Sequence, residues 1–172
     1  MKQIPKIIHQ IWGGNKPLPS YFEELSNSWK KLHPEWEYKL WNDYDIDCLV
    51  VKKYPQYYDQ FESFTYNMQR WDTVRYMILY TYGGIYADFD TECLKPIDEL
   101  IENKECFFSL EPFESAHINN KDIQLSTAIM GSIKGCDFMN KVLFDIFDNF
   151  KKLEFTDVHQ KVMDVVSSTG PL

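Results

Sequence analysis

Short apolar runs alternate with longer segments of helical periodicity along this chain, a pattern typical of an α/β sheet with helices on its faces. Runs with the length and composition of strands occupy residues 6–12, 36–40, 85–88, 106–110 and 127–133. Helical spacing of apolar side chains predicts helices that begin near residues 20 and 43, and further helices over 65–82, 137–150 and 158–166. We therefore expect an α/β fold.

Residues that start or stop helices support these boundaries. Ser20, with a glutamate three residues later, has the spacing of a capping box. Asn42 or Asp43 is expected to cap the helix after the second strand. The paired glycines at 83–84 predict the end of the helix over 65–82, because glycine tolerates the left-handed backbone of a helix terminus.

Two of the predicted helices carry apolar side chains at three- and four-residue spacings, which predicts one buried face on each. On the helix over 65–82 these side chains are Met68, Trp71, Ile78 and Leu79. On the helix over 137–150 they are Phe138, Val142, Ile146 and Phe150.

Composition and length narrow the class of protein. The chain has 172 residues, of which 44% are hydrophobic and 16% aromatic, so a sizeable core is expected and a disordered or fibrous chain is excluded. No internal repeat and no glycine-, serine- or proline-rich linker divides it. We therefore expect one domain over residues 1–172.

Charge is unevenly distributed. Eighteen lysines and arginines stand against 26 acidic residues, a net charge of −8 that argues against nucleic acid as a partner. Between Asp88 and Glu114 there are nine acidic residues and two lysines. An anionic ligand that binds near this stretch would need a metal ion between itself and the carboxylates.

Cysteines, histidines and the N-terminus point to no special chemistry. The four cysteines match neither a zinc pattern nor a secreted disulfide framework, so we expect reduced, mostly buried thiols. The four histidines have no metal-ligand spacing and are expected to be structural. No transmembrane segment or signal peptide is evident, which predicts a cytoplasmic protein, with contact at the inner face of the membrane left open.

Asp88 and Asp90 are the first candidates for a site. They lie two residues apart at the predicted carboxyl end of a strand, where open α/β sheets place their ligand crevice. Two oxygen donors there suit Mg²⁺ or Mn²⁺, which retain water and accept phosphate oxygens. The alternative is a pair of solvated loop acids, and the spacing alone favours that alternative.

Asp72 and Arg75 add a second pair on the preceding helix. They are three residues apart and share a helix face, and the helix ends in two glycines just before the strand of Asp88. An arginine in an acidic neighbourhood is suited to hold a diphosphate or a sugar hydroxyl. The alternative is an ordinary surface ion pair.

Taken together, these blocks resemble a known family. Residues 4–14, 33–38, 40–43 and 72–90 are similar, in this order, to the DXD-containing sugar transferases of glycosyltransferase family 32, of the capsular polysaccharide type. The glucosyltransferase domains of large clostridial toxins are a more distant resemblance. The resemblance implies a GT-A fold, a Rossmann-like nucleotide-binding sheet flanked by helices, a divalent metal, and sugar transfer with retention at the anomeric carbon.

The resemblance also implies roles for single residues. Asp88 and Asp90 match the metal and diphosphate site, and Asp90 is the expected direct ligand. Asp72 and Arg75 match positions that contact the donor sugar, and Trp12 matches the position that stacks on the donor base. Tyr86 matches an aromatic residue beside the donor. Trp12 could instead be a core residue, and no catalytic nucleophile is assigned.

Two departures from the family pattern matter. Where many members have an asparagine, this chain has Ser126 and Thr127, whose hydroxyls could still bond a ligand. Residues 169–171 match a motif after which members continue with more of the site. This predicts a domain that is truncated at its C-terminus, able to bind metal and nucleotide but poor at transfer.

The resulting functional hypothesis is a metal-dependent, retaining glycosyltransferase. It would move a sugar from a nucleotide-sugar donor, a UDP-sugar being favoured, to a glycan or lipid-linked acceptor in surface or capsular polysaccharide synthesis. One alternative is a metal-dependent phosphohydrolase, which would need more ligands, often histidines. Another is a sugar-binding module without turnover.

Overall fold

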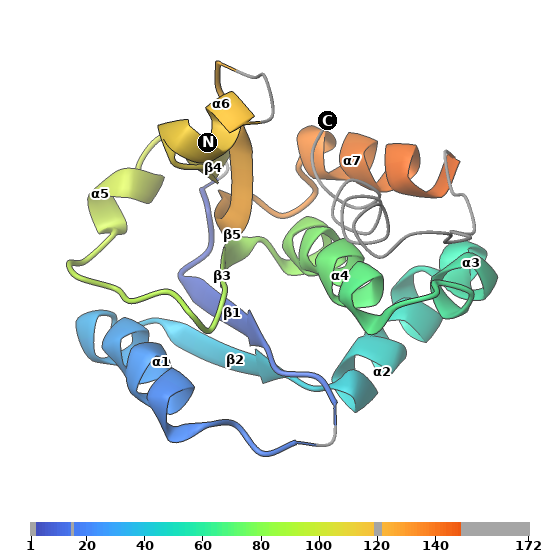
Figure 1. Cartoon of the computed structure of the whole chain (residues 1–172), viewed down its shortest axis with the longest axis horizontal. Coiled ribbons are helices and arrows are strands. Elements are labelled where there is room, and N and C mark those ends of the chain that lie inside the picture. Colours follow the sequence, from blue (N-terminus) through green and yellow to red (C-terminus); the bar gives the residue numbers. More distant parts are fainter. Residues whose placement is uncertain (1–2, 15, 119–121, 149–172) are drawn as a thin grey trace.

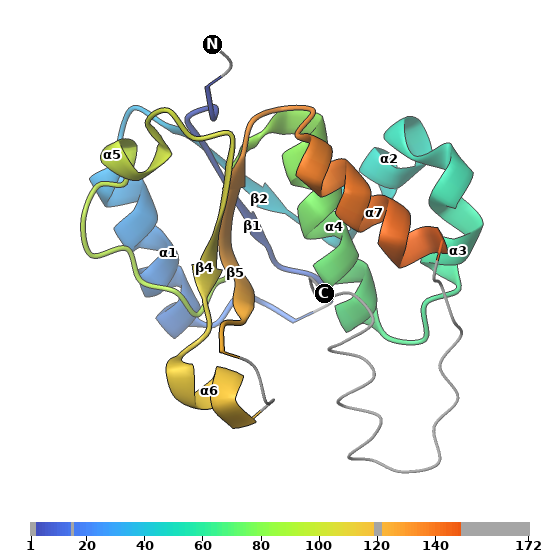
Figure 2. The same ribbon diagram turned by 90° about the horizontal axis from the view of Figure 1, so that it is seen from above.

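A five-stranded sheet lies between two layers of helices in the computed structural model of the chain, which describes residues 3–14, 16–118 and 122–148 (Figure 1). Figure 2 shows α1 and α5 on one face of the sheet, and α2, α3, α4 and α7 on the other. The α/β prediction is therefore confirmed.

The sheet is mixed. Its strands are β1 (Ile7–Ile11), β2 (Glu37–Trp41), β3 (Gly84–Ala87), β4 (Cys106–Leu110) and β5 (Leu125–Ser132), in the order β2-β1-β3-β5-β4. β1 is parallel to β2 and β3, whereas β5 is antiparallel to β3 and β4. All five strands agree with the predicted runs to within two residues.

The longer helices agree with those predicted from the sequence, whereas the short helices were not predicted. The helices are α1 (Ser20–Leu32), α2 (Asp43–Lys53), α3 (Tyr58–Glu62), α4 (Asn67–Tyr82), α5 (Asp98–Ile101), α6 (Phe113–Ile118) and α7 (Asp137–Asp148), with a 3₁₀ turn at Pro55–Tyr57. The missed helices α3, α5 and α6 have four to six residues, too few to show a helical period. The predicted helix over 158–166 lies outside the described residues.

Helix starts confirm one capping prediction and correct another. The side chain of Asn42 accepts a 2.9 Å hydrogen bond from the backbone N–H of Asp45, as expected of a cap on α2. The capping box of Ser20 is wrong, because Pro19 occupies the cap position of α1 and no side chain caps it. The proline ring fixes Pro19 at φ −61°, so the chain enters the helix without a capping side chain.

The paired glycines turn α4 into β3, as predicted. Gly83 and Gly84 have φ angles of 70° and 100°, which strain any residue with a side chain. A Cβ on Gly84 would lie 2.6 Å from the carbonyl oxygen of Ile7 in β1. Glycine therefore lets β3 pair closely with β1 and brings the face of α4 near the end of β3.

The buried faces of α4 and α7 differ from the predicted ones. α4 is buried continuously from Thr73 to Leu79, because it packs on the sheet on one side and against α7 on the other. Met68, expected in the core, is 47% exposed. Phe138 on α7 is 43% exposed and packs edge-on against Phe108, while Phe150 lies outside the described residues.

The cysteines are free thiols, as expected. Cys93 and Cys136 are buried, whereas Cys48 and Cys106 are only partly buried. In the part of the chain that the structure describes, no helix is both long and apolar enough to span a bilayer.

Candidate functional site

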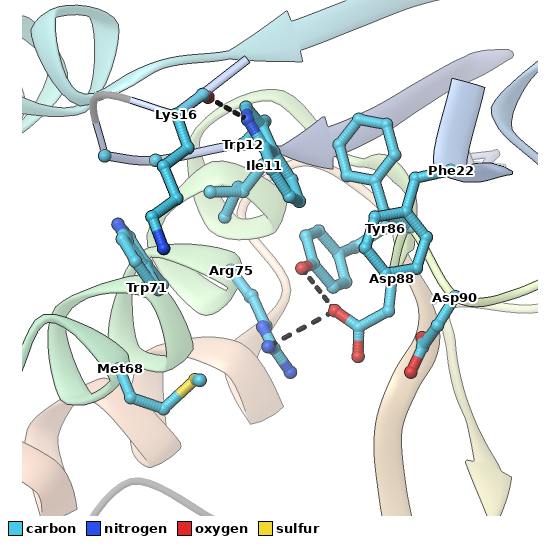
Figure 3. Close-up of a pocket in the computed structure, with 13 residues that line it drawn as sticks. Ile11, Trp12, Lys16, Phe22, Met68, Trp71, Arg75, Tyr86, Asp88 and Asp90 are labelled. Carbon is cyan, nitrogen blue, oxygen red and sulfur yellow. Dashed lines mark hydrogen bonds and ion pairs between the residues drawn. The ribbon is translucent and has the colours of Figure 1, made fainter. Parts of the chain in front are cut away.

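A pocket of about 550 Å³ opens at the carboxyl ends of β1 and β3 (Figure 3). It is formed by the end of β1 and the loop after it, one residue of α1, three residues of α4, and β3 with the turn after it. Its lining includes the side chains of Trp12, Phe22, Met68, Trp71, Arg75, Tyr86, Asp88, Phe89 and Asp90.

The turn that carries the two aspartates is held by its backbone. Asp88 follows the last residue of β3, and its N–H donates a 2.8 Å hydrogen bond to the carbonyl of Ala128. Its own carbonyl accepts from the backbone N–H of Thr91 at 3.2 Å, from the Thr91 hydroxyl at 2.5 Å, and from the Gln10 amide at 3.3 Å. The turn thus fixes the direction in which Asp88 leaves the sheet.

Gln10 belongs to a buried polar chain that supports this turn. It is fully buried, and its side-chain oxygen accepts a 2.7 Å hydrogen bond from the hydroxyl of Tyr38. That hydroxyl lies 2.8 Å from the hydroxyl of Ser26 on α1. Sequence reasoning missed Gln10, although a glutamine within a strand that otherwise holds isoleucines and His9 was a visible signal.

Arg75 is the centre of the site's electrostatics. One terminal nitrogen lies 2.9 Å from Asp72 Oδ1 and 3.2 Å from Asp88 Oδ1, and the other donates a 2.9 Å hydrogen bond to the hydroxyl of Thr127. The guanidinium carbon lies 5.0 Å from the centre of the Tyr86 ring. Arg75 thus joins α4, β3 and β5.

These contacts shift the pKa values of the cluster. Burial lowers the pKa of Arg75, but Tyr86, Asp72 and Asp88 raise it more, so the guanidinium stays charged. Burial raises the pKa of Asp88, which Arg75 and Tyr86 offset only in part. Burial likewise holds the pKa of Tyr86 well above 10, so its hydroxyl keeps its proton and donates a 2.6 Å hydrogen bond to Asp88 Oδ1.

The donor set fits a cation that is shared with a ligand. Asp88 and Asp90 both line the pocket and extend in the same direction in Figure 3. Within the described residues, no cluster of three or more histidine, cysteine or acidic side chains could form a complete metal cage. Mg²⁺ and Mn²⁺ bind through one or two carboxylates when water and phosphate oxygens complete their coordination. Asp88 and Asp90 fit a metal of this kind.

Trp12 packs against neighbouring aromatic side chains and also lines the pocket. Its indole packs against Phe22 and Phe89, with ring centres 5.7 and 5.6 Å away, and its N–H donates a 2.9 Å hydrogen bond to the carbonyl of Lys16. It is nevertheless only partly buried and lines the pocket. Base stacking by Trp12 stays a prediction.

Trp71 and Asp43 are site residues that sequence reasoning missed. Trp71 and Met68 lie at the left of the pocket in Figure 3, across from Asp88 and Asp90. The carboxylate of Asp43 accepts a 3.2 Å hydrogen bond from the Trp71 indole and a 2.6 Å hydrogen bond from the N–H of Gly14. Asp43 follows β2 at the ligand-binding edge of the sheet, and that position was the available signal.

The structure brings most of the predicted residues together. Those that line the pocket are Trp12, Arg75, Tyr86, Asp88 and Asp90. Asp72 is not among the lining residues and meets the site through Arg75. Thr127 bonds Arg75, whereas Ser126 is buried and accepts from the N–H of Ala128 at 3.3 Å.

Comparison with curated proteins finds fungal mannosyltransferases. Inositol phosphoceramide mannosyltransferase 3 of Schizosaccharomyces pombe is 37% identical over 98% of this chain and 43% of its own length. Mannosyl phosphorylinositol ceramide synthase SUR1 of Saccharomyces cerevisiae is 32% identical over 98% of this chain and 40% of its own length. The chain thus spans less than half the length of these relatives, and neither is named as a capsular polysaccharide enzyme.

Comparison with solved structures supports the predicted GT-A fold. The PaToxG glycosyltransferase superposes with a TM-score of 0.68 at 19% identity, covering 99% of this chain and 67% of its own. The profile of the family described as "Glycosyltransferase sugar-binding region containing DXD motif" matches residues 19–107. This range includes Asp43, Trp71, Arg75 and the aspartates of the pocket. The chain belongs to this family of DXD-containing glycosyltransferases.

Proposed function

We propose that this chain carries the donor site of a metal-dependent hexosyltransferase that moves mannose from a nucleotide sugar to a phosphoinositol-bearing lipid. The observation that carries the proposal is the meeting of Arg75, Asp88 and Asp90 in one pocket beside aromatic side chains. The names of the similar fungal proteins suggest mannose and the lipid acceptor. Of the two acceptors that the sequence left open, a glycan and a lipid-linked acceptor, these names favour the lipid, and they do not point to capsular polysaccharide synthesis.

Different residues of the pocket would bind different parts of a nucleotide-sugar donor. Arg75 is held in place by Asp72, Asp88 and Thr127, so its positive charge is oriented before a diphosphate arrives. Tyr86 keeps its proton and occupies Asp88 Oδ1, which directs the remaining carboxylate oxygen of Asp88 to other partners. A bound divalent cation would neutralise charge that develops on the departing diphosphate.

The aromatic side chains would hold the rest of the donor. Trp12, packed on Phe22 and Phe89, offers a rigid surface to the base. Trp71 is oriented by Asp43 on another side of the pocket. The proposal includes retention of configuration at the anomeric carbon and cytoplasmic residence.

The first test is calorimetric titration of nucleotide sugars, with and without Mn²⁺. GDP-mannose and UDP-glucose are compared, because the relatives are named as mannosyltransferases while the sequence favours a UDP-sugar. We expect metal-dependent binding that Asp90→Asn abolishes and that Asp59→Asn, an exposed aspartate on α3, leaves unchanged. Equal binding by the parent and the Asp90 variant would refute the metal assignment.

The second test separates transfer from its alternatives. The parent is incubated with the donor that binds, with Mn²⁺, and with or without phosphatidylinositol. Nucleotide release that requires the lipid supports a transferase. Phosphate release without acceptor would indicate the phosphohydrolase, and binding without turnover in either condition would indicate the sugar-binding module.

A further inference from the structure

A second pocket, of about 280 Å³, lies along the β2 edge of the sheet. It is formed by β2, the length of α2 and the last residue of α4, and Figure 2 shows these two helices on the same face of the sheet. The side chains that decide its chemistry are Lys39, Lys52 and Lys53, the tyrosines 44 and 82, and Asp45.

The charge of this pocket is opposite to that of the chain. The chain carries a net charge of −8, yet three lysines and one carboxylate line this pocket. Among the described residues, none of the ion pairs within 4.0 Å involves these three lysines. Asp47, the next acid on α2, is not among the lining residues, and partial burial together with Glu62 and Asp43 raises its pKa. The pocket therefore presents a local excess of positive charge.

Lys39 is the most constrained of the three lysines. It lies on the edge strand with its ammonium 3.7 Å from the ring centre of Trp41 and 5.5 Å from that of Tyr82. An inward-pointing charge on an edge strand also discourages pairing between sheets, and that role alone could explain Lys39. A role in preventing sheet pairing does not explain why Lys52 and Lys53, which lie on α2, line the same pocket.

The pocket is separate from the donor site but shares a helix with it. Trp71 lines the donor pocket and Tyr82 lines this one, eleven residues further along α4, which is about 16 Å at 1.5 Å per residue. Tyr44 is 75% exposed and Val51, beside Lys52, is 53% exposed. Lysine, tyrosine and aliphatic side chains together are typical of surfaces that contact the interface of a membrane.

We infer that this pocket binds the phosphate-bearing headgroup of an anionic lipid and docks the protein on a membrane surface. Charge complementarity carries the choice of ligand, because the lysines would neutralise a headgroup phosphate that the rest of this acidic chain repels. The functional consequence of this binding rests on the proposed function, since docking would hold the donor pocket near a lipid acceptor. The binding itself requires no transfer.

The test is co-flotation of the whole chain with vesicles of phosphatidylcholine alone, or of phosphatidylcholine mixed with phosphatidylinositol. The matched variants are Lys52→Gln with Lys53→Gln, and Lys30→Gln with Lys31→Gln, since each pair lies in the last turn of a helix. A lysine near an anionic bilayer contributes roughly fivefold to partitioning. We expect the parent to require phosphatidylinositol, the α2 pair to lose about 25-fold, and the α1 pair to bind like the parent.

Three outcomes would overturn the inference. One is binding that does not depend on phosphatidylinositol, and another is an equal loss in both lysine pairs, which would reveal a net-charge effect. The third is binding of inorganic phosphate at the pocket without any binding of vesicles. Phosphate binding is measured by the chemical shifts of the lysine side chains in NMR spectra. Circular dichroism melting establishes that the variants fold.

A parallel titration keeps this inference distinct from the proposed function. Lys52 and Lys53 do not line the donor pocket, so their variants should bind nucleotide sugar like the parent. If no protein binds a nucleotide sugar while phosphatidylinositol vesicles still bind the parent, the proposed function fails and the lipid site stands. If donor binding persists and vesicle binding fails, only the lipid site is refuted.

Discussion

Arg75 connects segments that are distant in the sequence, since its guanidinium contacts Asp72 on its own helix, Asp88 after β3, and Thr127 on β5. The planar fork of arginine allows these contacts at once, and the point charge of lysine does not. The geometry of the pocket at residue scale therefore depends on arginine, and not only on a positive charge.

Arg75→Lys tests this dependence. We expect donor affinity to fall by at least about tenfold, the loss of one or two charge-assisted hydrogen bonds. Calorimetry with Mn²⁺ and nucleotide sugar measures it. Arg70→Lys, on the same helix and paired with Glu62 at 3.7 Å, is the matched control and should bind normally. Normal binding by the Arg75 variant would show that a positive charge alone suffices at this position.

Asp43 acts as a positioning residue, because its two oxygens hold Gly14 and Trp71. An asparagine keeps one acceptor only. Asp43→Asn should therefore raise KM for the donor several-fold, by the roughly 1 kcal/mol of one hydrogen bond, and leave kcat nearly unchanged. Steady-state kinetics and the intrinsic tryptophan fluorescence report the change. Asp47→Asn serves as the control, and a fall in kcat at constant KM would exclude this role.

At the scale of elements, the junction between α4 and β3 sets the distance between Arg75 and Asp88. Gly83 and Gly84 reverse the chain within two residues, which no residue with a Cβ does without strain. The buried chain of Gln10, Tyr38 and Ser26 then ties the turn after β3 to β1, β2 and α1. Rigid elements thus support the site from both sides.

Gly84→Ala tests the junction. Gly84 and Gly135 both have positive φ, but a Cβ on Gly84 meets the Ile7 carbonyl at 2.6 Å, whereas a Cβ on Gly135 meets nothing within 4 Å. We expect Gly135→Ala to cost about 1–2 kcal/mol from backbone strain alone. Gly84→Ala should cost at least about 1 kcal/mol more from the clash. Urea unfolding compares the two, and equal losses would show that β3 shifts freely away from β1.

At the scale of the whole molecule, His9 makes stability depend on pH. Burial lowers its pKa from 6.5 to about 4, offset in part by the hydrogen bond to Gly83. Its Nδ1 accepts from the Trp41 indole at 3.2 Å, so the neutral ring carries its proton on Nε2 and donates to the Gly83 carbonyl at 2.9 Å. His9 is thus a structural residue of the core.

Because folding lowers the pKa of His9, acid destabilises the folded chain. The unfolded chain binds a proton at His9 near pH 6.5 and the folded chain only near pH 4, so acid favours unfolding. The stabilisation by neutral His9 is complete above pH 6.5 and is lost as the pH falls toward 4, by roughly 3 kcal/mol. NMR titration of the His9 ring should give a midpoint near 4, and a midpoint near 6.5 would contradict burial of the neutral form.

Local interactions made much of this fold predictable from sequence. The strands, the long helices, the Asn42 cap and the paired glycines depend on residues within a few positions of one another. The position of Asp88 and Asp90 at a strand end followed from the same local pattern. The start of α1 was mispredicted where Pro19 replaced the expected capping side chain.

Contacts between distant residues decided the rest. Periodicity does not show whether a strand pairs parallel or antiparallel, so the reversal of β5 against β3, which brings Thr127 to Arg75, came only from the tertiary structure. The same holds for Asp43 with Trp71, 28 positions apart, and for Gln10 with Asp88, 78 positions apart. The sequence by itself determined which side chains could serve a donor site. Folding decided which of them meet, because hydrogen bonds and ion pairs require proximity in space and not in the chain.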